Sequence, residues 1–161
     1  ETFRLHAVTA DVLDAFALQC GEAITLENGV QSAVSVDADR EQLNRILTNL
    51  VRNAVQALEA GGGSGSISIS AERQGSVTMV HVADTGPGIP AAIRDKVFAA
   101  FQSAARSGGT GLGLAISAEL AEAHGGSLQV ARTGPTGTTF TLSIPDQPTR
   151  IESRRAKPAS G

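Results

Sequence analysis

Apolar residues recur at helical spacing in three long segments of the chain. Residues 8–18 carry one such stripe, and a broader stripe runs along residues 43–58. Asp39 and Gln42 fit the first and fourth positions of a capping box, so we expect the second helix to begin just after Asp39. Gly61 and the two glycines after it should end this helix. The third helix is predicted over residues 111–124, and a shorter one from Pro90 to about residue 97.

Short apolar runs between these helices predict six strands, at residues 24–26, 34–36, 65–71, 77–84, 128–131 and 138–144. Two turns, at residues 74–75 and 134–137, should join four of them into hairpins. Strands and helices are mixed without regular alternation, which favours an α+β fold over a doubly wound sheet. Residues 102–109 are predicted as a small polar loop, and residues 146–161 as a tail without periodicity.

Composition narrows the function classes. The 161 residues suit one domain, and 41% hydrophobic residues are ordinary for a soluble globular protein. A net charge of -3 argues against a nucleic-acid binder, and no apolar run is long enough for a membrane span. We also expect no direct membrane contact from this fragment. The single cysteine, Cys20, excludes an internal disulfide. Because the chain begins with Glu1, we expect it to be an excised fragment.

Two asparagines stand out on the second helix. Asn49 and Asn53 lie four positions apart, so they fall about 40° apart on the flank of the apolar stripe. A ligand can meet a helix that packs on a sheet along this flank. An amide carbonyl is a hard oxygen donor of the kind that Mg²⁺ accepts beside phosphate oxygens and water. The alternative is two ordinary polar residues at a helix boundary.

Asp84 ends the apolar strand at residues 77–84. A carboxylate at such a position needs hydrogen-bond donors, and the exocyclic amine of adenine is a suitable one. Gly86 and Gly88 would let the backbone approach a flat ring. The alternative is an ordinary turn. Residues 86–91 also fit a loose dinucleotide-binding pattern, but Pro87 and Pro90 lack the N–H groups that would hold a pyrophosphate, which argues against a Rossmann site.

A glycine cluster precedes the third long helix. Gly109, Gly111 and Gly113 can present backbone N–H groups, and the helix N-terminus favours negative charge. The alternative is a flexible linker. Leu112 and Leu114 argue against a linker, because they can anchor in a core while the glycines stay open. This pattern favours a phosphate cradle.

In this order and spacing, the three segments resemble the N, G1 and G2 boxes of the sensor histidine kinase catalytic domain. This domain belongs to the superfamily of gyrase, heat-shock chaperone and histidine kinase ATPases. The resemblance covers residues 1–145 and implies a two-layer α/β sandwich of the Bergerat type, with a mixed sheet and helices on one face. It implies ATP and Mg²⁺ as cofactors, and it leaves residues 146–161 as a disordered tail.

The resemblance also implies roles for single residues. Asn53 would be the magnesium ligand, and Arg106, in a lid over residues 102–108, would reach a terminal phosphate unless it is simply a solvated arginine. Asn49 lies where related ATPases carry a water-activating glutamate; an amide is not a base, so transfer is favoured over hydrolysis. The implied nucleotide-binding set is Asn49, Asn53, Asp84, Gly86, Gly88, Ile89, Phe101, Gly109, Thr110, Gly111, Leu112, Gly113 and Thr139.

The implied reaction is transfer of the γ-phosphoryl group of Mg-ATP to a histidine on a separate helical dimerisation and phosphotransfer domain, for relay to a response regulator. None of His6, His81 and His124 precedes an acidic residue, as an acceptor histidine usually does, so the fragment should be inactive alone. We expect packing or capping roles for His81 and His124 and a cytoplasmic location, whether or not the parent protein is membrane-anchored. The alternatives are a serine kinase of the anti-sigma-factor type and a non-catalytic binding module of the same fold.

Overall fold

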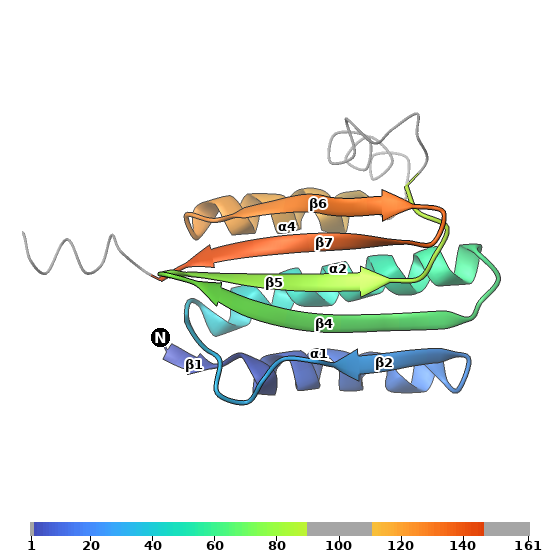
Figure 1. The fold of residues 1–161 in the computed structure, drawn as a ribbon, viewed down its shortest axis with the longest axis horizontal. Coiled ribbons are helices and arrows are strands. Elements are labelled where there is room, and N and C mark those ends of the chain that lie inside the picture. Colours follow the sequence, from blue (N-terminus) through green and yellow to red (C-terminus); the bar gives the residue numbers. More distant parts are fainter. Residues whose placement is uncertain (1, 90–110, 147–161) are drawn as a thin grey trace, which may run out of the picture.

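The computed structural model describes residues 2–89 and 111–146. Figure 1 shows the elements in chain order. They are β1 (Thr2–Arg4), α1 (Leu5–Cys20), β2 (Ile24–Asn28), β3 (Ser35–Asp37), α2 (Arg40–Ala60), β4 (Gly65–Gln74), β5 (Val77–Asp84), α4 (Gly111–Ala123), β6 (Ser127–Gly134) and β7 (Gly137–Pro145). The short helix predicted from Pro90 and the loop at residues 102–109 lie outside the described residues, as does the tail from residue 147.

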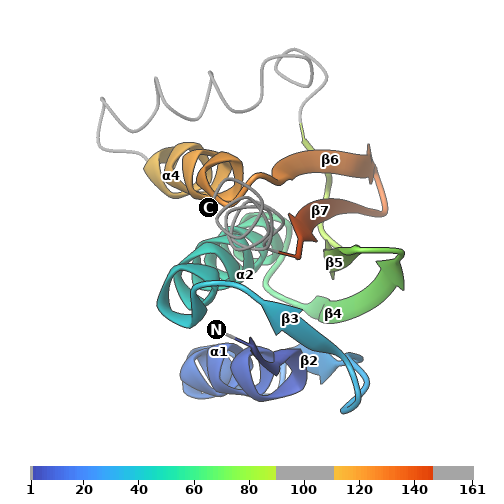
Figure 2. The same ribbon diagram turned by 90° about the vertical axis from the view of Figure 1, so that its left-hand side faces the viewer.

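The elements form two layers. Five strands make one sheet in the order β2-β4-β5-β7-β6, in which β2 and β4 are parallel and the other neighbours antiparallel. Helices α1, α2 and α4 cover one face of this sheet, as Figure 2 shows from the side. The predicted α+β sandwich, with a mixed sheet and helices on one face, is therefore confirmed.

The core lies between the sheet and the helices. On β5 the buried side chains alternate with half-buried ones, so that Val80 and Val82 face the helices. They meet the stripe predicted on α2, whose buried residues are Leu43, Ile46, Leu47, Leu50, Val51, Ala54, Val55 and Leu58. This layer holds α2 rigidly along the sheet, which fixes the position of both asparagines. Among the described residues, no helix has the length and apolar character that crossing a membrane requires.

The boundaries differ from the prediction where long-range pairing decides them. Strand β1 was not predicted, because a three-residue segment carries no readable pattern; it forms by antiparallel pairing with β3. Helix α1 begins at Leu5, which is fully buried, rather than at Val8. The cap of α2 is confirmed in part: Asp39 Oδ1 accepts a hydrogen bond from the Gln42 backbone N–H at 3.1 Å, but Gln42 Oε1 has no hydrogen-bond partner within residues 2–89 and 111–146.

The sandwich has two ends that are built differently (Figure 1). We call the first the terminus end; there Thr2 and Asp146, the first and last described residues, line one open groove. We call the other the loop end; it carries Gly86 after β5, Gly111 at the start of α4 and Gly134 at the turn between β6 and β7. Of the predicted site residues that the structure describes, most belong to the loop end.

Candidate functional site

The side chain of Asp84 is the most unusual group at the loop end. It is only 7% exposed, and its Oδ1 accepts a hydrogen bond from the Gly86 N–H at 2.8 Å. Burial raises the pKa of this carboxyl above its usual value, and the backbone N–H groups of Gly86 and Thr138 lower it again in part by donating hydrogen bonds to it. Asp84 is therefore a buried acceptor that favours a further donor.

The loop after Asp84 is in backbone contact with two other elements. Gly86 is buried, and a Cβ built on it would lie 3.4 Å from the Cβ of Ala57 on α2. Gly88 has a φ of 85°, and a Cβ there would overlap the carbonyl oxygen of Gly134. A larger residue at position 88 would push the loop away from Gly134, whereas a Cβ at position 86 would lie 3.0 Å from Asp84 Oδ1 and in ordinary contact with Ala57.

Helix α2 brings its two asparagines to the same region. Asn53 lies one turn before Ala57, the residue that supports Gly86, so both are on one face of the helix. Asn49 lies one turn earlier, where its Nδ2 donates to the Oγ of Ser117 on α4 at 3.2 Å and its Oδ1 accepts from Arg52 at 3.3 Å. The helix thus presents two neutral amides along the path from α4 to the Asp84 loop.

Helix α4 begins at Gly111, as predicted, and packs on α2 with its N-terminus at the loop end (Figure 1). Its first turn has no acidic residue, so the partial positive charge of the helix start is not cancelled from within the helix. Only the backbone is described for Leu112 and Gly113. Four further predicted site residues lie outside the described residues: Phe101, Arg106, Gly109 and Thr110.

One predicted site residue is separated from the others. Thr139 pairs with Ala83 and, by strand alternation, lies on the face of the sheet away from the helices. Its neighbour Thr138 pairs with Asp84, is 5% exposed and donates its N–H to the Asp84 carboxylate. Sequence reasoning missed Thr138; the signal was available, since residues alternate along a strand and Phe140 is plainly a core position.

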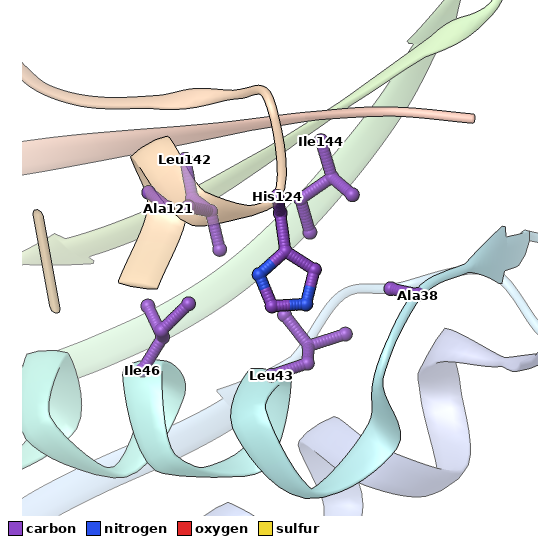
Figure 3. Close-up of a pocket in the computed structure, with 7 residues that line it drawn as sticks. All are labelled: Ala38, Leu43, Ile46, Ala121, His124, Leu142 and Ile144. Carbon is purple, nitrogen blue, oxygen red and sulfur yellow. The ribbon is translucent and has the colours of Figure 1, made fainter. Parts of the chain in front are cut away.

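The histidines lie apart from this region. His124, at the end of α4, has its Nδ1 2.8 Å from the Leu120 carbonyl oxygen, and its ring lines a small apolar cavity at the terminus end with Leu43 and Ile144 (Figure 3). On β5, His81 Nδ1 lies 2.8 Å from the Thr141 hydroxyl. Among the described residues, no group of three or more His, Cys, Asp or Glu side chains could hold a metal ion.

Residues 38–148 match the family of histidine kinase-, DNA gyrase B-, and HSP90-like ATPases. The matched segment covers more than half of the chain and contains α2, β5 and α4. The chain belongs to this family. Domains of this family bind ATP, so this chain is a histidine kinase-type ATPase domain.

The relatives of this ATPase domain include sensor histidine kinases. The sensor histidine kinase ZraS of Escherichia coli K12 is 40% identical over 175 residues, an alignment that covers 93% of this chain and 37% of ZraS. The circadian input-output histidine kinase CikA of Synechococcus elongatus is 40% identical over 127 residues, covering 76% of this chain and 16% of CikA. The chain thus spans well under half the length of either relative.

Solved structures agree with this assignment. The catalytic domain of the histidine kinase ThkA superposes with a TM-score of 0.77 at 28% identity, covering 91% of this chain and 96% of that domain. Full-length ShkA in complex with AMPPNP gives a TM-score of 0.76 at 29% identity, covering 90% of this chain and 30% of ShkA. The fold of this ATPase domain is that of a histidine kinase catalytic domain.

Proposed function

We propose that this chain binds Mg-ATP at the loop end and transfers its γ-phosphoryl group to a histidine on a separate helical domain of the parent protein. The observation that carries this proposal is the buried Asp84 carboxylate, which is held by backbone N–H groups next to the loop that contains Gly86 and Gly88. A carboxylate with a raised pKa is costly in an empty site, and it becomes favourable when a ligand donates to it.

The base end of the site fits adenine. The exocyclic amine of adenine is a donor, so it pairs with the Asp84 carboxylate, which accepts. Gly86 and Gly88 would place only backbone next to the ring, and a Cβ on Gly88 would move the loop because it would overlap the carbonyl oxygen of Gly134. Ile89, which follows them, is 7% exposed and offers an apolar edge. Thr138 holds Asp84 through its N–H, whereas Thr139 lies on the far face; a direct contact from Thr139 to nucleotide stays a prediction.

The phosphate end fits a magnesium-bound triphosphate. The amide oxygen of Asn53 is the proposed metal ligand, and Mg²⁺ supplies charge neutralisation on the phosphate oxygens when it is bound. Asn49 is neutral and held by Ser117 and Arg52, so it orients neighbouring groups and does not remove a proton from water. The start of α4 would cradle the phosphates from Gly109 to Gly113. Roles for Phe101, Arg106, Thr110 and Leu112 remain predictions from the sequence.

The similarity to histidine kinases also suggests the partners of the parent protein. ThkA has been solved in complex with the response regulator protein TrrA, and its chain there matches this one with a TM-score of 0.75 at 30% identity. We propose that the parent of this chain likewise passes its phosphoryl group from a histidine on a dimerisation domain to a response regulator. We further propose a catalytic domain over residues 1–145, a tail beyond it and a cytoplasmic location.

The decisive experiment supplies the acceptor. With labelled ATP alone, the chain should stay unlabelled and hydrolyse ATP very slowly. Adding the helical acceptor domain of the parent kinase should produce acid-labile phosphate on that domain, and Asn53→Ala should abolish it. Acid-labile phosphate on His6, His81 or His124 of the chain alone would contradict the proposal. Acid-stable phosphate on a partner's serine would favour the anti-sigma-factor alternative, and ATP binding with no transfer to any acceptor would favour a binding module.

A further inference from the structure

A bulge in β6 decides which side chain faces the Asp84 strand end. Val130 pairs with Phe140 on β7, but the next pair is Arg132 with Thr139, so Ala131 is the extra residue. The alternation of side chains shifts by one, and Thr133 rather than Arg132 lies opposite Thr138. Thr138 in turn lies opposite Asp84 on β5. Three polar residues are therefore aligned across β6, β7 and β5 at the loop end.

Hydrogen bonds connect this row to the glycine loop. The Ile89 N–H donates to Thr133 Oγ1 at 2.8 Å, and Thr133 Oγ1 lies 3.0 Å from Thr138 Oγ1. A hydroxyl can accept one hydrogen bond while donating another, so Thr133 can satisfy both partners at once. The Thr138 N–H completes the path by donating to the Asp84 carboxylate. The two ends of the segment from Asp84 to Ile89 are thus tied to the same pair of threonines.

Backbone packing places the same hairpin directly against the loop. A Cβ on Gly88 would overlap the carbonyl oxygen of Gly134, and a Cβ on Gly137 would overlap the carbonyl oxygen of Asp84. The turn between β6 and β7 is therefore one wall of the loop. Packing of this kind prevents approach but does not stop the loop from moving away, whereas a hydrogen bond to Ile89 does.

We propose that Thr133 is a positioning residue for base recognition: its hydroxyl holds the Gly86–Ile89 loop against the β6–β7 hairpin and so sets where the adenine ring lies relative to Asp84. This inference rests on the proposed function. It assigns Thr133 to the base end of the site and not to the phosphate end. Removing the hydroxyl removes the hydrogen bond that joins the Ile89 N–H to the hairpin, so the loop is held less closely against it.

The test compares three variants of the chain. Thr133→Val keeps the shape and strand preference of the side chain but removes its hydroxyl, whereas Thr133→Ser keeps the hydroxyl. The matched control, Thr25→Val, removes an exposed threonine hydroxyl on β2. Calorimetry with adenosine and with Mg-ADP should show both affinities reduced by the same factor in Thr133→Val, about threefold to tenfold, as expected for one neutral hydrogen bond. Thr133→Ser and Thr25→Val should bind like the wild type.

Amide hydrogen exchange provides the second readout. The Ile89 amide should exchange faster in Thr133→Val and return to the wild-type rate in Thr133→Ser, while exchange in α2 stays unchanged. Wild-type binding in Thr133→Val overturns this inference alone. A loss that Thr133→Ser does not recover overturns it too, because packing would then be the cause. A wild-type chain that fails to bind ADP overturns the proposed function together with this inference. If Thr133→Val does not fold, Thr133→Ala takes its place with the same expectations.

Discussion

The two ends of the sandwich satisfy their polar groups in opposite ways. At the terminus end, Arg73 forks onto Asp146 with Nη–Oδ distances of 3.1 and 2.7 Å, so a charge meets an opposite charge in half-exposed surroundings. At the loop end, the described hydrogen bonds to the buried Asp84 carboxylate come from the backbone N–H groups of Gly86 and Thr138. Asp146 therefore has a cationic partner, whereas the described partners of Asp84 are neutral N–H donors.

The burial of Asp84 makes the stability of the domain depend on pH. Because the pKa of Asp84 is raised in the folded domain, the folded state binds that proton more tightly than the unfolded chain does. The contribution of Asp84 to the free energy of unfolding therefore decreases as pH rises from its ordinary value through the raised one, and it stays lower above that window. The loop end thus gives up stability near neutral pH that a donating ligand would return.

The largest difference between the two ends is expected when the carboxylate of each is removed. Asp84→Ala should reduce ADP affinity about tenfold to a hundredfold, because a buried, charge-assisted hydrogen bond is lost. Asp146→Ala, which removes a carboxylate at the terminus end, should bind ADP like the wild type. Calorimetry is the suitable assay, since the chain contains no Trp or Tyr that could serve as an optical probe. Unchanged affinity in a folded Asp84→Ala variant would refute the base-binding role.

Glycines allow a second matched test. Gly88→Ala at the loop end and Gly126→Ala at the terminus end each place a Cβ against a backbone carbonyl oxygen, that of Gly134 and that of Ser143 respectively. Both variants should melt at lower temperature by circular dichroism. Only Gly88→Ala should also weaken ADP binding, by about tenfold. A residue with a Cβ adopts a φ of 85° only at a cost of roughly 1–2 kcal/mol, so the loop would move to a different conformation. Equal binding losses in both variants would mean that general destabilisation is the cause.

A third test separates the two halves of the nucleotide. Asn53→Ala should weaken Mg-ATP binding about tenfold and leave adenosine binding unchanged, because the side chain is proposed to act only through the metal and phosphates. Asn44→Ala is the matched control: it removes an asparagine from the same helix nearer the terminus end, where the side chain accepts from Thr48. Calorimetry with both ligands decides the matter. Parallel losses for adenosine and Mg-ATP would indicate damage to α2.

The features that the sequence predicted are those fixed by local physics. Helix α2 follows from its apolar stripe, the Asp39 cap and the glycines after Ala60, and Asp84 follows from its position at the end of an apolar strand. The order of the three boxes is also a local property of the chain. These elements determine most of the loop end before any tertiary contact is known.

The features that the sequence did not predict depend on pairing between distant segments. Strand β1 exists because β3 pairs with it, and the bulge at Ala131 is set by register with β7. This register decides that Thr133, rather than Arg132, lies opposite Thr138. A shift of one residue moves every later side chain of β6 to the other face, so period and composition alone could not assign this role to Thr133.

The pKa of Asp84 provides a further test of the loop end. Burial raises the pKa of the free carboxyl, and a ligand that donates to the ionised form should lower it again. ADP affinity should then increase with pH through this window, opposite in sign to the contribution of Asp84 to the free energy of unfolding. The Asp84 carboxyl carbon, followed by NMR with and without ADP, reports the pKa directly. A pKa that ADP leaves unchanged would exclude a direct contact with the carboxylate.

The smallest effect is expected at the terminus end. The Arg73 and Asp146 side chains are 36% and 34% exposed, so solvent screens their ion pair, and breaking it with Arg73→Ala should cost about 1 kcal/mol or less. Arg73 also donates to the Thr78 hydroxyl and the Gly75 carbonyl, bonds that Arg73→Lys cannot all reproduce, so the lysine variant should recover only part of the melting temperature. Added salt should narrow the difference in melting temperature between wild type and Arg73→Ala.

ADP affinity should be the same in wild type, Arg73→Ala and Arg73→Lys, because the ion pair and the proposed nucleotide site lie at opposite ends of the sheet. An altered ADP affinity in Arg73→Ala would show that the two ends are coupled through β5.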